Sequence, residues 1–442
     1  MLPSYCMYTW WMKVIRMQSA KVPLRIPLPL LFLAMAALLV FPIVVVNAAH
    51  SIGQGSYPMP DVLLTVHTVI IGVIFPVIIG VFYQLGPVAF VTGSVSHRLA
   101  FIQAVSYVVS AVCFLLCWTF LDSWGIIPLA VTGTLVLLSL LLFFALVFSV
   151  VRKRTAGTMS AFFTYAALVH GLLLVTFASI LVWGLAQGAS LIFTNWIGAH
   201  AITGIYGIFL QFAMAFAYKL IPMFQLSHAN LKRRPIITFV FLNVGLLSED
   251  AGLLLAIHVL GAIGSVFIAI SIIHFMFEVL TMYKKRIRKQ VEWPMRSVFV
   301  GWMWIALGTI LLALWQLVGG VLINMPEVVF VVVVVGGLVQ MITGYLFKII
   351  SFLIWTVRYG EGHNASTAPP LRSAIRKEWA KSIMIVWNVG LVLMLIGIIA
   401  GIASIVVLGA TAFMVCAMMA VREWWRMISP RGVFPPITTP VS

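Results

Sequence analysis

The sequence predicts an all-α membrane protein that crosses the bilayer twelve times. Twelve apolar runs are each long enough to span the hydrocarbon core, which takes roughly 20 helical residues. Of the 442 residues, 63% are hydrophobic and 8% are charged, whereas charged residues make up about 25% of a soluble domain. In addition, the alternation of basic and non-basic connections places all 27 lysine and arginine residues on one side of the membrane, as expected of a polytopic membrane protein.

The twelve runs follow one another with short connections. In order, they cover residues 26–47, 62–92, 98–120, 126–151, 158–186, 193–224, 231–248, 252–283, 295–320, 326–357, 380–400 and 402–421. The first run is longer than the roughly 7–15 apolar residues of a secretory signal and follows four basic groups, so we expect it to be a retained span. The four cysteines lie apart or one turn apart, and we expect them to pack between helices.

Basic connections alternate with connections that contain neither lysine nor arginine. The basic ones hold Lys13 to Arg25, Arg98, Arg152–Arg154, Lys232–Arg234, Lys284–Lys289 with Arg296, Arg358–Lys381, and Arg422–Arg431. Because short basic loops stay in the cytoplasm, both termini are expected to be cytoplasmic in a multi-pass protein of the cell inner (cytoplasmic) membrane. The net charge of +17 then faces anionic lipid, and no patterned nucleic-acid-binding domain is present.

One short pattern recurs at the ends of the second, sixth and tenth runs. The segments Gly80–Pro87, Ala215–Pro222 and Gly344–Ser351 place small, aromatic, polar and aliphatic residues at matching offsets, 135 and 129 residues apart. Four runs separate successive copies, so we predict three pseudo-repeats of four helices. The predicted units are a cytoplasmic N-terminal segment (1–25), repeats 26–157, 158–290 and 291–421, and a cytoplasmic tail (422–442).

Local physics accounts for part of this pattern. The aromatic residues Tyr83, Tyr218 and Phe347 suit the headgroup region of the bilayer. The lysines that follow the second and third of them, Lys219 and Lys348, are expected to extend to the inner surface. The repeat is therefore evidence for architecture before it is evidence for chemistry.

Histidine is the residue most worth tracing, because an ionisable or metal-ligating group inside the bilayer is costly and marks a candidate site. His67 and His200 lie early in the second and sixth runs, within roughly 10 Å of the outer face at 1.5 Å per residue. We expect them to converge near a central axis, where neutral imidazoles could bind haem iron or copper. His258 has a similar depth, and His170 also lies in a run. The alternative for all four is a hydrogen bond to a neighbouring helix.

His274 and Glu278 are four residues apart and share a helix face. They could form part of a proton path, but Lys284 and Lys285 follow closely and favour an ion pair at the inner surface. Acidic residues sit on the opposite side, where we place them in water-facing turns that could attract cations or a basic partner: Asp61, Asp122, Glu249, Asp250 and Glu327.

These features together resemble the catalytic subunit of haem-copper oxidases, and more closely a shorter group of oxidase-subunit-I-like bacterial membrane proteins. The resemblance covers the first ten spans. The strings that carry it are His67–Gly72 with Tyr83–Pro87, Ala199–His200 with Tyr218–His228, and Phe347–Trp355 with Arg358–Gly360. It implies a haem-copper-oxidase-like bundle in which His67 is an axial ligand of a low-spin haem and His200 is a copper ligand.

The resemblance also shows what is missing. The tenth span of the oxidases supplies histidines to both haems and the seventh supplies a histidine pair, but residues 326–356 and 231–248 contain none. A normal binuclear oxygen-reducing centre is therefore not expected. One haem b on His67, with Met341 or Met325 as a second ligand or with none, remains open. So does a copper site that uses His200 with His258 or His170.

Three classes of function follow. The first is an oxidase-like protein with a single haem or copper site near the outer leaflet, which transfers electrons or reacts with oxygen or nitric oxide and meets an electron-donor protein or other membrane subunits. The second is a cofactor-poor structural or assembly subunit of a larger respiratory complex. The third is a transporter, which is disfavoured because no run shows the paired mid-bilayer Gly/Pro breaks of many carriers. We expect the first.

Overall fold

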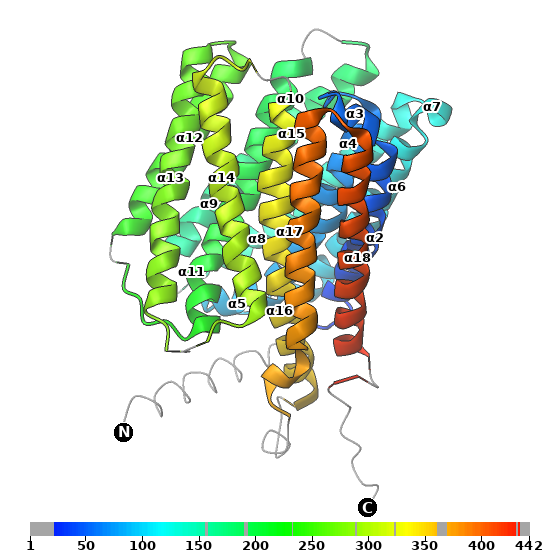
Figure 1. The fold of residues 1–442 in the computed structure, drawn as a ribbon. Coiled ribbons are helices and arrows are strands. Elements are labelled where there is room, and N and C mark those ends of the chain that lie inside the picture. Colours follow the sequence, from blue (N-terminus) through cyan, green and yellow to red (C-terminus); the bar gives the residue numbers. More distant parts are fainter. Residues whose placement is uncertain are drawn as a thin grey trace, which may run out of the picture.

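Twelve long helices run from one end of the molecule to the other in a computed structural model of the chain (Figure 1). The structure describes residues 22–154, 158–189, 193–231, 233–287, 290–321, 324–359, 369–429 and 432–433. Within these residues the regular elements are helices, and each of the twelve is long and apolar enough to cross a membrane. The prediction of an all-α multi-pass membrane protein is therefore confirmed.

The helix boundaries lie within a few residues of most of the predicted runs. The spans are α2 (Pro27–Asn47), α4–η1–α5 (Pro60–His67, Thr68–Ile74, Phe75–Phe90), α6 (His97–Thr119), α8 (Ile126–Val151), α9 (Met159–Ala186), α10–η2–α11 (Phe193–Ile202, Thr203–Leu210, Gln211–Gln225), α12 (Arg234–Leu254), α13 (His258–Lys284), α14 (Trp293–Leu317), α15–η3–α16 (Met325–Phe330, Val331–Val339, Gln340–Tyr359), α17 (Lys377–Ala400) and α18 (Ala403–Ile428). Three short helices lie in connections: α3 (Ala49–Gly53), α7 (Leu121–Trp124) and η5 (Leu371–Ala374).

The second, sixth and tenth spans form the centre of the bundle. Their apolar windows are 67%, 78% and 89% buried, whereas no other span exceeds 56%. The remaining nine described spans pack in a ring around them, and α18 closes the ring against α2 (Figure 1). The spans that share the recurring sequence pattern are thus the ones that avoid lipid.

Each of these central spans contains a π-helical segment. The segments η1, η2 and η3 begin at Thr68, Thr203 and Val331, 135 and 128 residues apart, close to the period of the sequence pattern. Such segments are rare and often lie at functional sites. Their matching positions are consistent with the predicted pseudo-repeats, although the division of the chain into three equivalent units stays a prediction.

The two ends of the bundle differ in charge. One end, called here the basic end, carries the described lysines and arginines, which flank helix ends such as those of α6, α8, α13 and α17. The other end, called here the cavity end, carries α3, α7 and α10 (Figure 1). Assignment of the basic end to the cytoplasm stays a prediction, and most of the proposed N-terminal segment (residues 1–21) lies outside the described residues.

Candidate functional site

A cavity of about 570 Å³ lies at the cavity end and reaches in among the central spans. Its wall is largely aliphatic and aromatic, and it contains three histidines, His67, His200 and His258. We call it the histidine cavity. Its volume falls within the range of roughly 300–1,000 Å³ that is usual for ligand and cofactor pockets. The expected convergence of His67 and His200 on one interior space is therefore observed.

The orientation of His67 is fixed by its surroundings. It ends α4, and its Nδ1 lies 2.7 Å from the carbonyl oxygen of Leu63, one turn earlier. Because a carbonyl only accepts hydrogen bonds, Nδ1 must carry the proton, and Nε2 retains the lone pair. The imidazole stacks on the indole of Trp118 at 5.6 Å and 19°, while Phe114 meets it edge-on at 5.5 Å. The result is one oriented nitrogen available as a ligand.

His200 belongs to α10, just before η2, and its ring lies close enough to His67 for charges on the two to interact. Its Nδ1 is buried and has no hydrogen-bond partner among the described residues. An unpaired buried polar atom costs about 1–3 kcal/mol. This nitrogen is enclosed by protein, so only the rest of the His200 ring faces the histidine cavity.

Carboxylates line the same region, in a different setting from the one predicted. The seventh span was expected to end at residue 248, with Glu249 and Asp250 in a water-facing turn. Instead α12 continues to Leu254, and both side chains are buried, at 0% and 5% exposure. Gln316 donates to Glu249 at 3.0 Å, and Thr203, the first residue of η2, donates to Asp250 at 2.8 Å. These amide and hydroxyl donors allow the helix to continue through two acidic residues.

Glu327 is a second correction of the same kind. It lies in the first turn of α15 and lines the histidine cavity with 5% exposure, so it does not face water as predicted. Neither oxygen of the Glu327 carboxylate has a hydrogen bond of regular geometry within the described ranges, although the backbone amide of Tyr57 approaches the carboxylate. Tyr57 lies outside the spans, and burial together with the Glu327 charge raises the pKa of its phenol. Of the other predicted outer acids, Asp122 is exposed.

The remaining candidate ligands differ in whether they line the histidine cavity. His258 begins α13 and lies exposed at the rim of the histidine cavity, shallower than predicted. Met341 faces a second, deeper cavity and is not in the wall that contains His67. His170 also lies outside that wall: its Nε2 is 3.3 Å from Asn243 Oδ1, and Gly207 packs against its ring so closely that an added Cβ would lie 2.8 Å from it. The interhelical hydrogen bond considered for His170 is thus observed.

The donor set discriminates between the predicted cofactors. Among the described residues, no group of three or more His, Cys, Asp or Glu side chains is arranged to bind a metal ion. A copper ion that takes all of its ligands from the protein would therefore lack a third ligand here. Haem brings four equatorial nitrogens of its own and needs only an axial imidazole. The residues present fit haem better than bare copper.

Near the basic end, His274 and Glu278 belong to a separate buried cluster. Glu278 is fully buried, its Oε2 accepts a hydrogen bond from Tyr218 at 2.5 Å, and Thr238 lies 3.4 Å from the same oxygen. His274 Nδ1 lies 2.9 Å from the Thr238 hydroxyl and 3.8 Å from Glu278 Oε1. The predicted ion pair with Lys284 and Lys285 is not formed, because both lysines end α13 in exposed positions.

The recurring segment also has partners that the sequence did not indicate. Lys348 is 4% exposed and pairs with Glu292 at 2.5 Å, so it does not extend freely to the surface as predicted. Lys219, at the equivalent place in the sixth span, is partly buried. In the second span, the Tyr83 hydroxyl donates to Gln103 at 2.7 Å. Each repeat position thus makes a different contact.

A small apolar cavity of about 70 Å³ lies deeper on the axis. The second, sixth and tenth spans alone line it, with residues such as Ile78, Phe212 and Met341. An aliphatic and aromatic lining of this kind excludes water. Together with the packed residues around it, this layer separates the histidine cavity from the basic end.

Sequence reasoning missed Trp118 and Gln316. Trp118 fixes the plane of the His67 ring, and Gln316 donates a hydrogen bond that stabilises the buried Glu249. Both lie in spans remote in sequence from the residue they contact, and a single Trp or Gln within an apolar run carries no signal of its partner. The sequence matches no family model and no curated protein significantly.

Proposed function

We propose that this chain is a membrane redox protein that binds a single haem in the histidine cavity, with Nε2 of His67 as the axial ligand. The observation that carries the proposal is the oriented imidazole: Leu63 fixes its tautomer and Trp118 fixes its plane, as outer-sphere groups do for metal-ligating histidines. His200 lines the same cavity and is the candidate for a further contact to the haem or to a bound gas, although its Nδ1 is enclosed by protein and does not face the cavity.

Haem in this position would supply one-electron transfer or binding of a small gas such as oxygen or nitric oxide. The protein's own residues would hold the group, keep His67 neutral and exclude water through the apolar wall. The apolar layer below the cavity would direct exchange with the solution to the cavity end. By the positive-inside rule, that end faces the outer side of the cytoplasmic membrane, where an electron-donor protein could dock.

One observation favours the second candidate, a cofactor-poor subunit of a larger membrane complex. Haem carries two propionates, and none of the described residues in the wall of the histidine cavity is a lysine or an arginine. Glu249 and Glu327 are in that wall instead. Propionates would therefore have to reach water, or to rely on neutral donors such as Gln316.

An absorption spectrum of protein purified after growth with added haem decides between the two. We expect a Soret band and one haem per chain by pyridine haemochrome assay. His67→Ala should abolish the band, and His200→Ala should shift or weaken it. The matched control, His170→Ala, removes a histidine outside the cavity wall and should leave the band unchanged.

Thermal unfolding of each purified variant shows whether it is folded, so loss of the band cannot be mistaken for loss of the protein. Absence of a Soret band in haem-supplied wild type, or an unchanged band in folded His67→Ala, refutes the haem proposal. The first of these outcomes supports the cofactor-poor subunit.

A further inference from the structure

On both α14 and α17, basic side chains near the basic end are followed by exposed apolar side chains along the helix. This arrangement suits the headgroup and the acyl chains of a lipid. On α17, Lys377 and Lys381 precede four aliphatic residues at helical spacings of three and four, Ile385, Val389, Val392 and Ile396. These four side chains are 45–52% exposed within the membrane-spanning part of the helix. One face of α17 is therefore cationic at its end and apolar along its length.

The neighbouring helix repeats this arrangement. On α14, Arg296 is exposed near the start of the helix, and Met303, Leu307 and Leu314 follow along one face at 43–53% exposure. The two helices are joined where Trp304 Nε1 donates to Asn388 Oδ1 at 2.7 Å. We call the exposed apolar residues of each helix an apolar track, and the two tracks flank this contact.

Indole rings make cation–π contacts with the basic side chains at this end of α14 and α17. Trp293 carries the guanidinium of Arg296 at 4.4 Å and the ammonium of Lys381 at 5.6 Å from its ring centre, one from each helix. Cation–π contacts of this kind fix the position of the charge. Arg296 also donates from Nε to the Val291 carbonyl oxygen at 3.0 Å, so the terminal nitrogens of its guanidinium are the donors that could meet an anion. A second indole, Trp379, has Arg376 and Arg422 at 4.9 and 4.8 Å.

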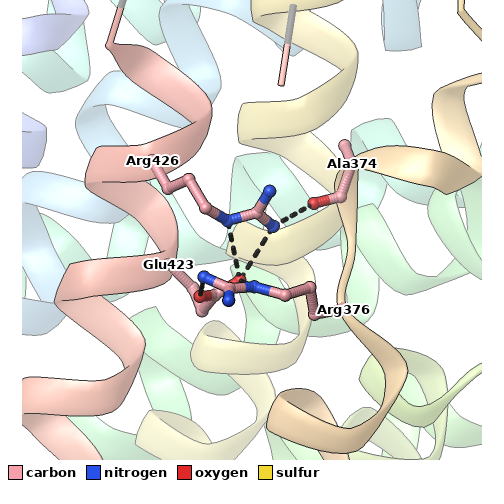
Figure 2. A network of polar contacts seen from close by, with 4 residues as sticks. All are labelled: Ala374, Arg376, Glu423 and Arg426. Atoms are coloured by element: carbon pink, nitrogen blue, oxygen red, sulfur yellow. Dashed lines mark hydrogen bonds and ion pairs between the residues drawn. The ribbon is translucent and has the colours of Figure 1, made fainter. Parts of the chain in front are cut away.

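The local charges do not cancel. Figure 2 shows that Arg376 and Arg426 converge on one carboxylate, the fully buried Glu423, and that Arg426 also donates to the Ala374 carbonyl. This network uses a single anion for two cations. Glu292, which precedes α14, pairs with Lys348, and the exposed Glu378 is the only other acid between residues 369 and 429, so the cations of α14, α17 and α18 remain in excess. An anion from outside the chain would complete the set.

We infer that the lipid-facing surface of α14 and α17 binds an anionic phospholipid of the surrounding bilayer, with its phosphate at Arg296, Lys381 and Lys377 and its acyl chains along the two apolar tracks. Clusters of basic residues next to the hydrocarbon region attract anionic lipid, and each cation contributes separately. The apolar tracks continue past the cations into the depth of the membrane, which suits a lipid and does not suit a soluble polyanion. This inference is independent of the proposed haem.

The test compares lipids and variants on the purified full-length chain in detergent at low salt. Phosphatidylglycerol should raise the midpoint of thermal unfolding, and native mass spectrometry should show a retained molecule, whereas phosphatidylcholine at the same concentration should do neither. The double variant Arg296→Gln/Lys381→Gln should bind phosphatidylglycerol roughly tenfold more weakly or worse. The matched control, Lys284→Gln/Lys285→Gln, removes two exposed cations from α13 and should bind it as the wild type does.

Three results would overturn the inference: equal stabilisation by phosphatidylcholine, an equal loss in the control variant, or the same stabilisation from inorganic phosphate. If the double variant does not fold, the single variant Lys377→Gln takes its place, because this exposed side chain makes no ion pair in the described part of the chain. It should weaken binding of phosphatidylglycerol several-fold, and an unchanged affinity would count against the site.

Discussion

The basic end and the cavity end differ in how their buried charged groups are paired. At the basic end, charged side chains are matched within the protein: Glu423 accepts bonds from two arginines, Lys348 pairs with Glu292, and Glu278 is bonded to Tyr218. These contacts tie together helices that are far apart in sequence. These buried charges therefore have partners that explain their burial, although Oε1 of Glu278 has no hydrogen bond within the described residues.

The cavity end leaves comparable groups incomplete. Glu327 has no regular hydrogen bond in the described part of the chain, and one oxygen each of Glu249 and Asp250 is without a partner there. The same holds for Nδ1 of His200. The histidine cavity adjoins Glu249, Glu327 and His200.

The difference is one of ion pairing: buried charges of the basic end lie beside opposite charges, whereas Glu249 and Asp250 at the cavity end have neutral donors. A buried donor or acceptor without a partner costs about 1–3 kcal/mol, and a buried charge costs far more. The carboxylates of the cavity end must therefore be protonated or accompanied by a bound group. Substitutions at the two ends should accordingly differ in their effect on stability.

The largest effect is expected from Glu423→Ala. This change leaves Arg376 and Arg426 without their shared partner, and we expect a loss of roughly 3 kcal/mol in the free energy of unfolding. The value is at the lower end of the range for a broken buried ion pair because both arginines reach water. Chemical unfolding of the purified protein measures this. Glu378→Ala, an exposed acid on α17, is the control and should change stability by less than about 0.5 kcal/mol. Equal losses of stability in both variants would contradict the assignment of Glu423 as the shared partner of the two arginines.

The next effect tests how Glu249 is positioned. At Gly264 of α13, an added Cβ would lie 2.4 Å from the backbone nitrogen of Glu249 and 2.8 Å from the Gly245 carbonyl oxygen. Gly264→Ala should therefore force α12 and α13 apart, at about 2 kcal/mol. It should also disturb the hydrogen bond from Gln316 to Glu249, so any haem spectrum should shift.

Gly93→Ala is the matched control for Gly264→Ala, because its Cβ would meet nothing within 4 Å. A Gly264→Ala protein with the stability of the Gly93→Ala protein would show that the two helices have room to spare. Glu249 would then be held by something other than their close approach.

A smaller effect is expected from Tyr218→Phe. It removes the donor to Glu278 but keeps the ring that packs against Phe163 and Phe275. We expect a loss of about 1–2 kcal/mol, as for a hydrogen bond to a buried acid. Thermal unfolding with Glu278→Gln as a companion separates the bond from the charge. If Tyr218→Phe is neutral while Glu278→Gln is not, Thr238 and not Tyr218 is the main partner of the carboxylate.

The number and order of the spans followed from the sequence because hydrophobic length alone defines a span. The convergence of His67 and His200 followed as well, from their equal depth in equivalent spans. The end of the seventh span did not: an apolar run was expected to end at Glu249, and only the donors Gln316 and Thr203 allow the helix to continue. The role predicted for His67 as a ligand remains untested by the fold.

Other features were hidden for the same reason. The π-helical segments depend on one additional residue per turn, which the apolar pattern of η3, Val331–Val339, does not reveal. The pairing of Tyr218 with Glu278 joins residues 60 positions apart. Depth in the membrane is readable from sequence, whereas the identity of the neighbour at that depth depends on helix rotation.

The smallest effect is the sharpest test of the difference between the two ends. Glu327→Gln replaces a carboxyl group by an amide of the same shape, and the amide oxygen can still face the backbone amide of Tyr57, the one group that approaches the carboxylate in the described structure. We expect the free energy of unfolding of the ligand-free protein to stay within about 0.5 kcal/mol of the wild type, or to rise. Glu423→Gln, the same change at the basic end, should be clearly destabilising because it weakens bonds to two arginines. A loss of more than about 1 kcal/mol in Glu327→Gln would reveal a structural partner of the carboxylate and would remove this difference between the two ends.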